Sequence, residues 1–467
     1  MTSSSGKNTD TLWSELQARG IRYCHWKSNE HLAEALRGET DLDILADGEK
    51  HEEVREVMEA FGWKRVESPP RLRFHGVEDW IGLYEASGSL FHIHLHYKLI
   101  TGKKFVKEQL LPWEELMLST RVWDEHSGIF VAEPNLEVII LALRVGIKTK
   151  WSRVVLGGRL PENIGSEIEY LKERTSSAER ERVAKVMFGD ADGAVMARLV
   201  EGLIESPVRL TSSRLTVVKI KWFVLTRLYS SRRHGVVATH LLYWLNALRA
   251  KFIKLGDRLG ATFQNKKTLT PQGAVIALVG ADGAGKSTLA RELESWFAWK
   301  LDTHLVYLGQ RKNAFTRILK LISFDLWAVY LARVKYRVVR KAYRLRARGS
   351  IVIADRYPQI TVAGINDGPL IQNDDSGAWL HRTLRRYEQR VYTKIRDEYP
   401  PDVVVKLHVS PEVALARKGN RTPESVQRKT EIIKELSFPD SVVLDIDASE
   451  QIERVVMEVK RRIWTHL

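Results

Sequence analysis

The chain has 467 residues, and its 44% hydrophobic and 28% charged residues describe a globular protein with apolar material for two or three cores. A single cysteine, Cys24, excludes both a disulfide framework and a cysteine-based zinc site. The net charge of +15 favours partners rich in phosphate or other anionic groups.

Residues 1–13 lack the apolar segment of a secretory signal, and no apolar run is long enough to suggest a spanning helix. We therefore expect a cytoplasmic protein, or one that lies peripherally at the inner face of the membrane.

Four zones are predicted along the chain. Residues 1–125 mix short helices with strand-like runs, and 126–255 place apolar residues at helical spacing. Residues 256–272 form a polar linker with Gly and Pro, and 273–467 alternate Val/Ile-rich strands with helices. Apolar strands between helices indicate a parallel sheet covered on both faces. The expected fold class is α/β, with an α+β N-terminal domain, a helical region and a C-terminal parallel sheet.

Within the first zone, two acidic residues are predicted to share one face of a strand. Asp41 and Asp43 alternate along DLDILAD, so their carboxylates could bind divalent cations together. The run HIHLHY, 92–97, likewise places three histidines on one strand face.

The segment 22–47, with KSN at 27–29 ahead of DLD, resembles the start of the nucleotidyltransferase-like family of the DNA-polymerase-beta type. The resemblance implies metal ions at Asp41 and Asp43 and a third carboxylate on a neighbouring strand, where this chain has His94. Imidazole suits Zn²⁺, Mn²⁺ or Ni²⁺ better than Mg²⁺. Three interpretations stay open: a weakly catalytic or non-catalytic domain that binds substrate or nucleotide, a transferase with a histidine-containing metal site, and a strand face without a ligand.

The helical zone carries a concentrated positive charge. Residues 207–267 hold thirteen Lys/Arg against one acid, and aromatic residues are interleaved with them. This pattern is typical of nucleic-acid binding or of contact with an anionic membrane surface. It is also compatible with packed helices whose charges are solvated.

A phosphate-binding loop opens the fourth zone. The sequence GADGAGKST follows an apolar strand and precedes a helix, as the GxxxxGK(S/T) motif requires. Lys286 is expected to reach the β- and γ-phosphates of ATP, and the Ser287 hydroxyl to hold Mg²⁺. The residues predicted to surround the phosphates are Gly280, Asp282, Gly283, Ala284, Gly285, Lys286, Ser287 and Thr288.

From about 273 to 467 the chain resembles the thymidylate kinase family and its thymidylate-kinase-like relatives. The resemblance rests on Asp282, on the DRY triplet at 355–357, on the arginine-bearing lid at 411–421 and on the last strand and its loop at 446–456. It implies that Asp282 faces the phosphate acceptor and that the last loop contacts adenine. We therefore add Arg417, Arg421, Ala448 and Ser449 to the residues expected around the nucleotide.

These positions also fit the chemistry of phosphoryl transfer, which needs positioning and charge neutralisation. Asp355 could orient a Mg²⁺-bound water or the acceptor, and Arg356 could grip an acceptor phosphate through two hydrogen bonds. Arg417 could close over the transition state. Taken alone, a DRY triplet is often a structural ion pair, and a lid arginine is often only a solvated charge.

Departures from the family concern the acceptor. The chain has Val279, YLGQRKN at 307–313 and the pair Gly364-Ile365 where thymidylate kinases carry substrate-binding residues. A basic helical segment, 315–349, is predicted to bury a face made of Leu319, Ile322, Leu326, Tyr330 and Val334.

We therefore expect an ATP- and Mg²⁺-dependent kinase that phosphorylates a nucleoside monophosphate or a sugar or glycan. The alternatives are a bifunctional enzyme with an active N-terminal nucleotidyltransferase, and an ATP-gated binding module on nucleic acid or membrane.

Overall fold

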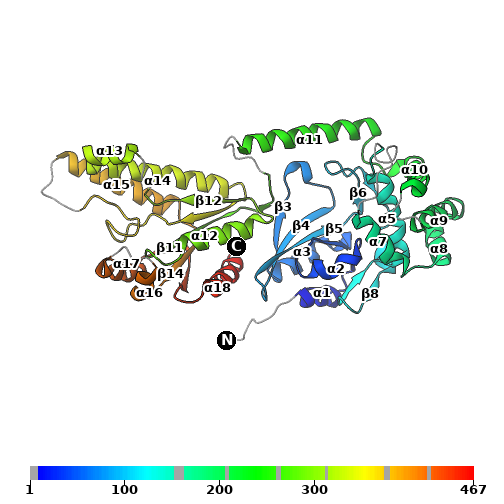
Figure 1. The fold of residues 1–467 in the computed structure, drawn as a ribbon, viewed down its shortest axis with the longest axis horizontal. Coiled ribbons are helices and arrows are strands. Elements are labelled where there is room, and N and C mark those ends of the chain that lie inside the picture. Colours follow the sequence, from blue (N-terminus) through cyan, green and yellow to red (C-terminus); the bar gives the residue numbers. More distant parts are fainter. Residues whose placement is uncertain are drawn as a thin grey trace. The chain divides into compact units, whose positions relative to one another are not determined.

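The computed structural model describes residues 9–151, 162–205, 210–258, 265–310, 314–372, 379–417 and 422–467. The chain forms two compact units (Figure 1), one made of 1–84 with 89–263 and the other of 85–88 with 264–467. Across these described ranges, every helix is too short or too polar to cross a membrane.

The first unit is built on a mixed sheet in which the strands run in the order β3-β4-β5-β2-β1-β9-β8. Strand β5 pairs in parallel with β2 and antiparallel with β4, so that His94 lies opposite Asp43 on one side and Asp79 on the other. The strands span Tyr23–His25 (β1), Leu42–Ala46 (β2), Lys64–Glu67 (β3), Val77–Tyr84 (β4), Ser89–His96 (β5), Val122–Asp124 (β8) and Ile129–Val131 (β9).

Both faces of this sheet are covered. Ile44 on β2 packs in a core with α1 (Thr9–Ala18) and α3 (His51–Ala60), whereas its neighbour Leu45 packs with α5 (Pro134–Lys148). The helical part of the chain thus shares a core with the sheet. The remaining elements of the unit are α2 (Leu32–Leu36), β6 (Ile100–Thr101), β7 (Gln109–Leu110), α4 (Glu114–Thr120), α7 (Glu162–Lys172), α8 (Ser177–Phe188), α9 (Asp190–Ile204), α10 (Leu210–Arg227) and α11 (Val236–Arg258).

The second unit has a five-stranded sheet in the order β12-β13-β11-β14-β15, with every pairing parallel. The predicted α/β class with a parallel sheet is therefore confirmed. Its elements are β10 (Thr268–Leu269), β11 (Ala274–Gly280), α12 (Lys286–Ala298), β12 (Thr303–Tyr307), α13 (Ala314–Ile322), α14 (Phe324–Arg346), β13 (Ile351–Asp355), α15 (Trp379–Glu398), β14 (Val403–His408), α16 (Pro411–Arg417), α17 (Pro423–Glu435), β15 (Val442–Asp447) and α18 (Ile452–Thr465).

Two neighbouring buried strands of this sheet, β11 and β13, end at the edge where the phosphate loop begins. β11 and β13 are buried along their whole length and end at Gly280 and Asp355. In parallel α/β sheets, ligands bind beyond the carboxyl ends of the strands. The phosphate loop follows β11 at this edge.

The predicted face of the basic segment 315–349 is wrong in part: Leu319, Tyr330 and Val334 are half-buried, but Ile322 and Leu326 are exposed. The helix breaks at Ser323, whose hydroxyl accepts a hydrogen bond from Leu326 N at 3.3 Å and begins α14. Ile322 and Leu326 are consequently 71% and 40% exposed. The break resets the helical register, and the buried face of α14 consists of Trp327, Ala328, Leu331, Ala332, Lys335, Val339, Ala342 and Leu345.

The predicted linker, 256–272, also contains regular structure. Helix α11 continues to Arg258, and Thr268–Leu269 forms β10.

Candidate functional site

The phosphate loop joins β11 to α12 through backbone conformations that favour glycine. Gly283 and Gly285 have φ of +92° and +85°, and a Cβ atom on Gly283 would lie 2.7 Å from the Ala414 carbonyl oxygen. Gly285 is also the residue that precedes the first turn of α12. A helix N-terminus behind a glycine-rich loop offers backbone N–H groups to phosphate oxygens.

Lys286 is buried inside this loop. Its ammonium group donates hydrogen bonds to the carbonyl oxygens of Gly280 at 2.8 Å and Ala281 at 2.7 Å. Burial and the positive charge of Arg356 lower the pKa of Lys286 to about 8. The charged form of Lys286 is therefore unfavourable in this loop unless an anion binds beside it.

Ser287 and Asp355 meet at the end of β13. The Ser287 hydroxyl donates to Asp355 Oδ2 at 2.6 Å, and Asp355 Oδ1 is buried without a hydrogen-bond partner among the described residues. A buried carboxylate oxygen in this position needs a donor or a cation. The pair fits Mg²⁺, which prefers hard oxygen ligands and keeps several waters. Ser287 would hold the ion directly, and Asp355 would hold it directly or through a water.

Arg356 lies beside the loop with a φ of +78°, a strained value for a residue that is not glycine. Its guanidinium group donates to Asp282 Oδ1 at 3.1 Å and to Asp367 Oδ2 at 3.3 Å. Lys429 on α17 donates to the second oxygen of Asp282 at 2.8 Å. Burial opposes ionisation of Asp282, but Lys429 and Arg356 hold its pKa well below the usual range.

Sequence reasoning placed Asp282 and Arg356 together but missed the residues that hold them. Asp367 and Lys429 come from a loop and a helix outside the matched motifs. Lys335 on α14 extends this network, because its buried ammonium group lies 3.4 Å from Asp367 Oδ1 and 3.2 Å from the Tyr392 hydroxyl. Lys335 lies on the buried face of α14, and a basic residue on such a face could have indicated a functional role. The face predicted for 315–349 did not include it.

The residues expected near adenine also come together. Arg417 donates to the Ala448 carbonyl oxygen at 2.8 Å, and Ser449 N donates to Asp447 Oδ1 at 2.9 Å. Beside them lies a pocket of about 600 Å³, within the range of small-molecule sites. Its lining includes His408, Ser410, Gln427, Lys434, Asp447 and Ser449. Arg421, predicted to act with Arg417, lies outside the described residues.

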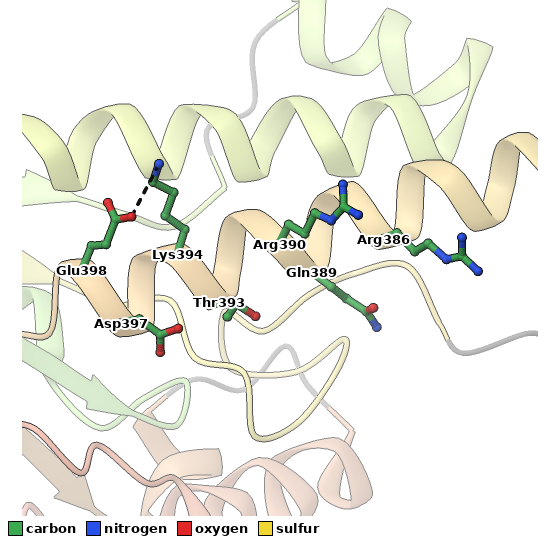
Figure 2. Close-up of a pocket in the computed structure, with 7 residues that line it drawn as sticks. All are labelled: Arg386, Gln389, Arg390, Thr393, Lys394, Asp397 and Glu398. Atoms are coloured by element: carbon green, nitrogen blue, oxygen red, sulfur yellow. Dashed lines mark ion pairs between the residues drawn. The ribbon is translucent and has the colours of Figure 1, made fainter.

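A second concavity of about 470 Å³ runs along α15 (Figure 2). All of its lining residues lie on that one helix, and Lys394 pairs with Glu398 at 3.5 Å. None of them belongs to the phosphate loop, and we assign the concavity no role. The lining residues are Arg386, Gln389, Arg390, Thr393, Lys394, Asp397 and Glu398.

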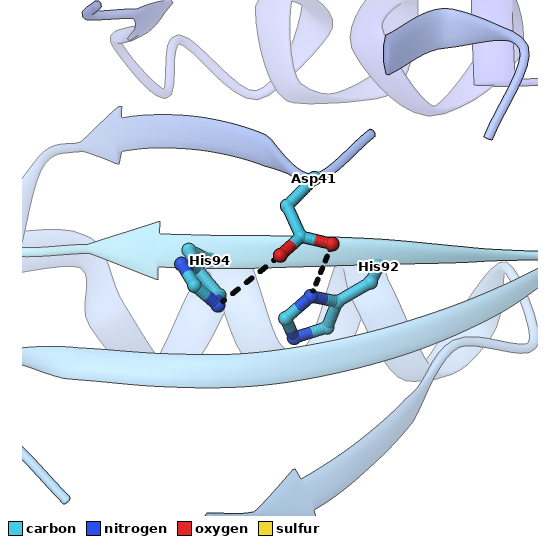
Figure 3. A group of neighbouring side chains, drawn as sticks. All are labelled: Asp41, His92 and His94. Atoms are coloured by element: carbon cyan, nitrogen blue, oxygen red, sulfur yellow. Dashed lines mark ion pairs between the residues drawn. The ribbon is translucent and has the colours of Figure 1, made fainter. Parts of the chain in front are cut away.

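In the first unit, the predicted metal residues gather around β5. Asp41 lies close to both His92 and His94 (Figure 3), with Asp41 Oδ1 3.0 Å from His92 Nδ1 and Asp41 Oδ2 3.9 Å from His94 Nε2. Asp43 Oδ1 lies 3.5 Å from His94 Nδ1 and 3.3 Å from His96 Nε2. Sequence reasoning named Asp41, Asp43 and His94 as ligands and missed Asp79, which the pairing of β4 with β5 brings in.

Two lysines, Lys27 and Lys107, lie beside Asp43 in this cluster. Lys27 pairs with Asp43 at 2.8 Å, and burial of Asp43 is outweighed by Lys27, His94 and His96, which hold its pKa well below the usual range. Burial and the charge of Lys27 lower the pKa of Lys107 to about 8. Burial lowers the pKa of His96 to about 4.

The KSN segment is hydrogen-bonded to a carboxylate of the helical region, that of Glu137 on α5. Asn29 donates to both carboxylate oxygens of Glu137, through its side chain at 2.7 Å and its backbone at 3.2 Å. Burial raises the pKa of Glu137 to about 7. The asparagine of this motif therefore holds the loop in place, while Lys27 reaches Asp43.

Comparisons with known proteins agree with the nucleotide site. No protein-family model matches the chain. Two Escherichia coli K12 proteins described as uncharacterized ATP-binding proteins are similar to it. YghR is 25% identical over 218 residues, covering 40% of this chain and 86% of YghR. YghS is 28% identical over 223 residues, covering 41% of this chain and 93% of YghS.

Among solved structures, a deoxyadenosine kinase from M. mycoides with bound dATP is 16% identical with a TM-score of 0.28. The superposition covers 41% of this chain and 98% of the kinase.

Proposed function

We propose that the second unit is an ATP- and Mg²⁺-dependent phosphotransferase of the thymidylate-kinase-like class. The observation that carries the proposal is the Ser287–Asp355 contact beside the buried Lys286, because it joins a phosphate-binding loop to a carboxylate with one unsatisfied oxygen. The ATP-binding description of both bacterial relatives supports the nucleotide.

Each group has a physical role in this proposal. Lys286 exchanges its two loop carbonyls for β- and γ-phosphate oxygens and neutralises their charge. Mg²⁺, when bound, neutralises further phosphate charge. Asp355 orients the acceptor hydroxyl or a water at the end of β13. Arg417 bonds the loop that contacts adenine, next to the 600 Å³ pocket.

The acceptor side is the cluster of Asp282, Arg356 and Lys429. With Lys335 and Asp367, which extend this cluster, three cations face two carboxylates. The surplus positive charge suits an acceptor phosphate on a nucleoside monophosphate or on a phosphorylated sugar or glycan. The substitutions at Val279 and Gly364-Ile365 disfavour thymidylate itself.

An acceptor panel with γ-labelled ATP tests the proposal. The full chain should transfer label to a member of a set of nucleoside monophosphates, sugars, sugar phosphates and oligosaccharides, and only with Mg²⁺ or Mn²⁺ present. A chain that binds ATP but labels none of them would contradict the kinase assignment and favour an ATP-gated binding module.

The first unit supports a second candidate function, nucleotidyl transfer. Asp41 and Asp43 each lie near His94, and Lys27 pairs with Asp43. This arrangement favours nucleotidyl transfer, because carboxylates for metal ions stand beside a cation for a phosphate chain. Label transfer from α-labelled nucleotides, lost in Asp43→Asn, is the expected result. Absence of transfer with Mg²⁺, Mn²⁺ and Zn²⁺ would remove this candidate.

A further inference from the structure

His92 and Asp41 bring an imidazole nitrogen and a carboxylate oxygen close together without a hydrogen bond between them. The His92 side chain is fully buried, and its Nδ1 makes no hydrogen bond within the described residues although Asp41 Oδ1 lies 3.0 Å away. Its other nitrogen, Nε2, is 3.1 Å from Asp79 Oδ1. If Nε2–H donates to Asp79, the Nδ1 lone pair and a carboxylate oxygen face each other. Either a proton or a metal ion between the two atoms would relieve this contact.

Asp79 is well placed to fix that arrangement. Its second oxygen accepts a hydrogen bond from the Ser68 hydroxyl at 2.7 Å, and its own exposure is low. A carboxylate that holds one imidazole nitrogen while the other faces a ligand position is the usual outer partner of a metal-bound histidine.

His94, two residues further along β5, also lies among carboxylates. Its Nδ1 lies 3.5 Å from Asp43 Oδ1, so Asp43 can accept from that nitrogen. Its Nε2 faces two carboxylates, with Asp79 Oδ1 at 3.3 Å and Asp41 Oδ2 at 3.9 Å. The rings of His92 and His94 stand nearly perpendicular, with their centroids 4.4 Å apart. Figure 3 shows the Asp41 carboxylate between the two rings. The ligand atoms of the three residues lie within 4.8 Å of one another. Ligands around a tetrahedral Zn²⁺ are about 3.3 Å apart, so side-chain rotations that draw these atoms together would complete the site.

We propose that Asp41, His92 Nδ1 and His94 Nε2 form a site for one divalent transition-metal ion, with Asp79 and Asp43 as outer partners of the two imidazoles. Two imidazoles and one carboxylate select first-row transition metals such as Zn²⁺ over Mg²⁺, and they leave positions open for a further ligand. The site belongs to the first unit, and the proposal does not depend on the kinase activity.

A neighbouring triad, Asp43 with His94 and His96, is the rival position for the ion. Asp43 is already neutralised by Lys27 at 2.8 Å, and His96 Nδ1 lies 3.4 Å from the Lys98 carbonyl oxygen. A cation there would meet the ammonium group of Lys27. The triad with Asp41 contains the buried His92 Nδ1, which makes no hydrogen bond among the described residues, and we assign the ion to this triad.

Titration of the full, tag-free and chelator-treated chain with Co²⁺, followed by visible absorption, tests the site. We expect one Co²⁺ per chain, displaced by an equivalent of Zn²⁺ and not by about 100-fold more Mg²⁺. Asp41→Asn and His92→Ala should each weaken binding about 100-fold or more, because loss of an outer partner alone costs 10- to 100-fold. His304→Ala, which removes a histidine 3.2 Å from Asp302 in the second unit, is the matched control and should bind normally.

Asp41→Asn and one further variant, His96→Ala, keep the test decisive. Asp41→Asn preserves side-chain shape at a partly exposed position, so it remains informative if His92→Ala fails to fold. His96→Ala should keep Co²⁺ affinity within about threefold, since it lies outside the assigned triad. Fewer than about 0.1 Co²⁺ per chain, full affinity in Asp41→Asn, or loss of binding in His96→Ala with retention in His92→Ala would each overturn the assignment.

Discussion

At the scale of single residues, the second unit depends on a carboxylate with one unsatisfied oxygen. Asp355→Asn keeps an oxygen for the Ser287 hydroxyl but loses the charge that would hold Mg²⁺. We expect phosphoryl transfer to slow about 100-fold while ATP affinity changes less than about tenfold. Single-turnover transfer and calorimetric ATP titration measure the two effects. Equal losses in both would indicate that Asp355 only supports the loop.

Glu137 gives the first unit a stability that depends on pH. Its folded pKa of about 7 lies above the unfolded value, so the stabilisation is complete below about pH 4.5 and is lost as pH rises through 7. The free energy of unfolding should fall by up to about 3 kcal/mol between pH 5 and pH 8. Urea unfolding of Glu137→Gln across this range should show a flatter pH dependence than the native chain. An identical slope in the two proteins would refute the assignment.

Short motifs made many of the site residues predictable. The loop Gly280–Thr288, the DRY triplet and DLD each carry local spacing that has a chemical reason. The partners of these residues had no such signal. Asp79 meets His94 only through the register of β4 with β5, and Lys429 meets Asp282 across 147 residues of sequence.

At the scale of elements, α17 brings a cation to the acceptor side. Lys429→Met removes the partner of Asp282 Oδ2, and it should lower kcat/KM for the acceptor about tenfold or more while leaving KM for ATP within about threefold. Arg428→Met, one position away and exposed, is the matched control. Steady-state kinetics with the acceptor found by the panel provide the comparison. A change in KM for ATP with no change in kcat/KM for the acceptor would contradict the assignment of Lys429 to the acceptor side.

The strands of the second unit were predictable because continuous Val/Ile runs between helices allow few alternatives. The break between α13 and α14 was not, because Ser323 interrupts a segment whose periodicity continues through it. A serine that caps α14 looks the same in sequence as a serine inside a helix. The buried face shifted as a result, and it includes Lys335, which joins the polar network around Asp367.

At the scale of the whole molecule, the positive charge coincides with exposed apolar residues on α11. Trp244 and Phe252 are 61% and 69% exposed, and Arg249 and Lys251 lie beside them on the same helix. This composition suits an anionic membrane surface. The chain should bind phosphatidylserine vesicles, with affinity falling steeply between about 50 and 500 mM salt, and Trp244→Ser with Phe252→Ser should weaken binding. Cosedimentation that is absent or independent of salt would contradict this.

The central claim is γ-phosphoryl transfer at the phosphate loop. It is tested most directly by single-turnover transfer from γ-labelled ATP in the full chain, in Lys286→Ala and in Lys341→Ala, whose lysine is exposed on α14. We predict that Lys286→Ala slows transfer about 100-fold or more, since it removes the charge that faces the phosphates, and that Lys341→Ala matches the native chain. Transfer at the native rate in Lys286→Ala would contradict the account.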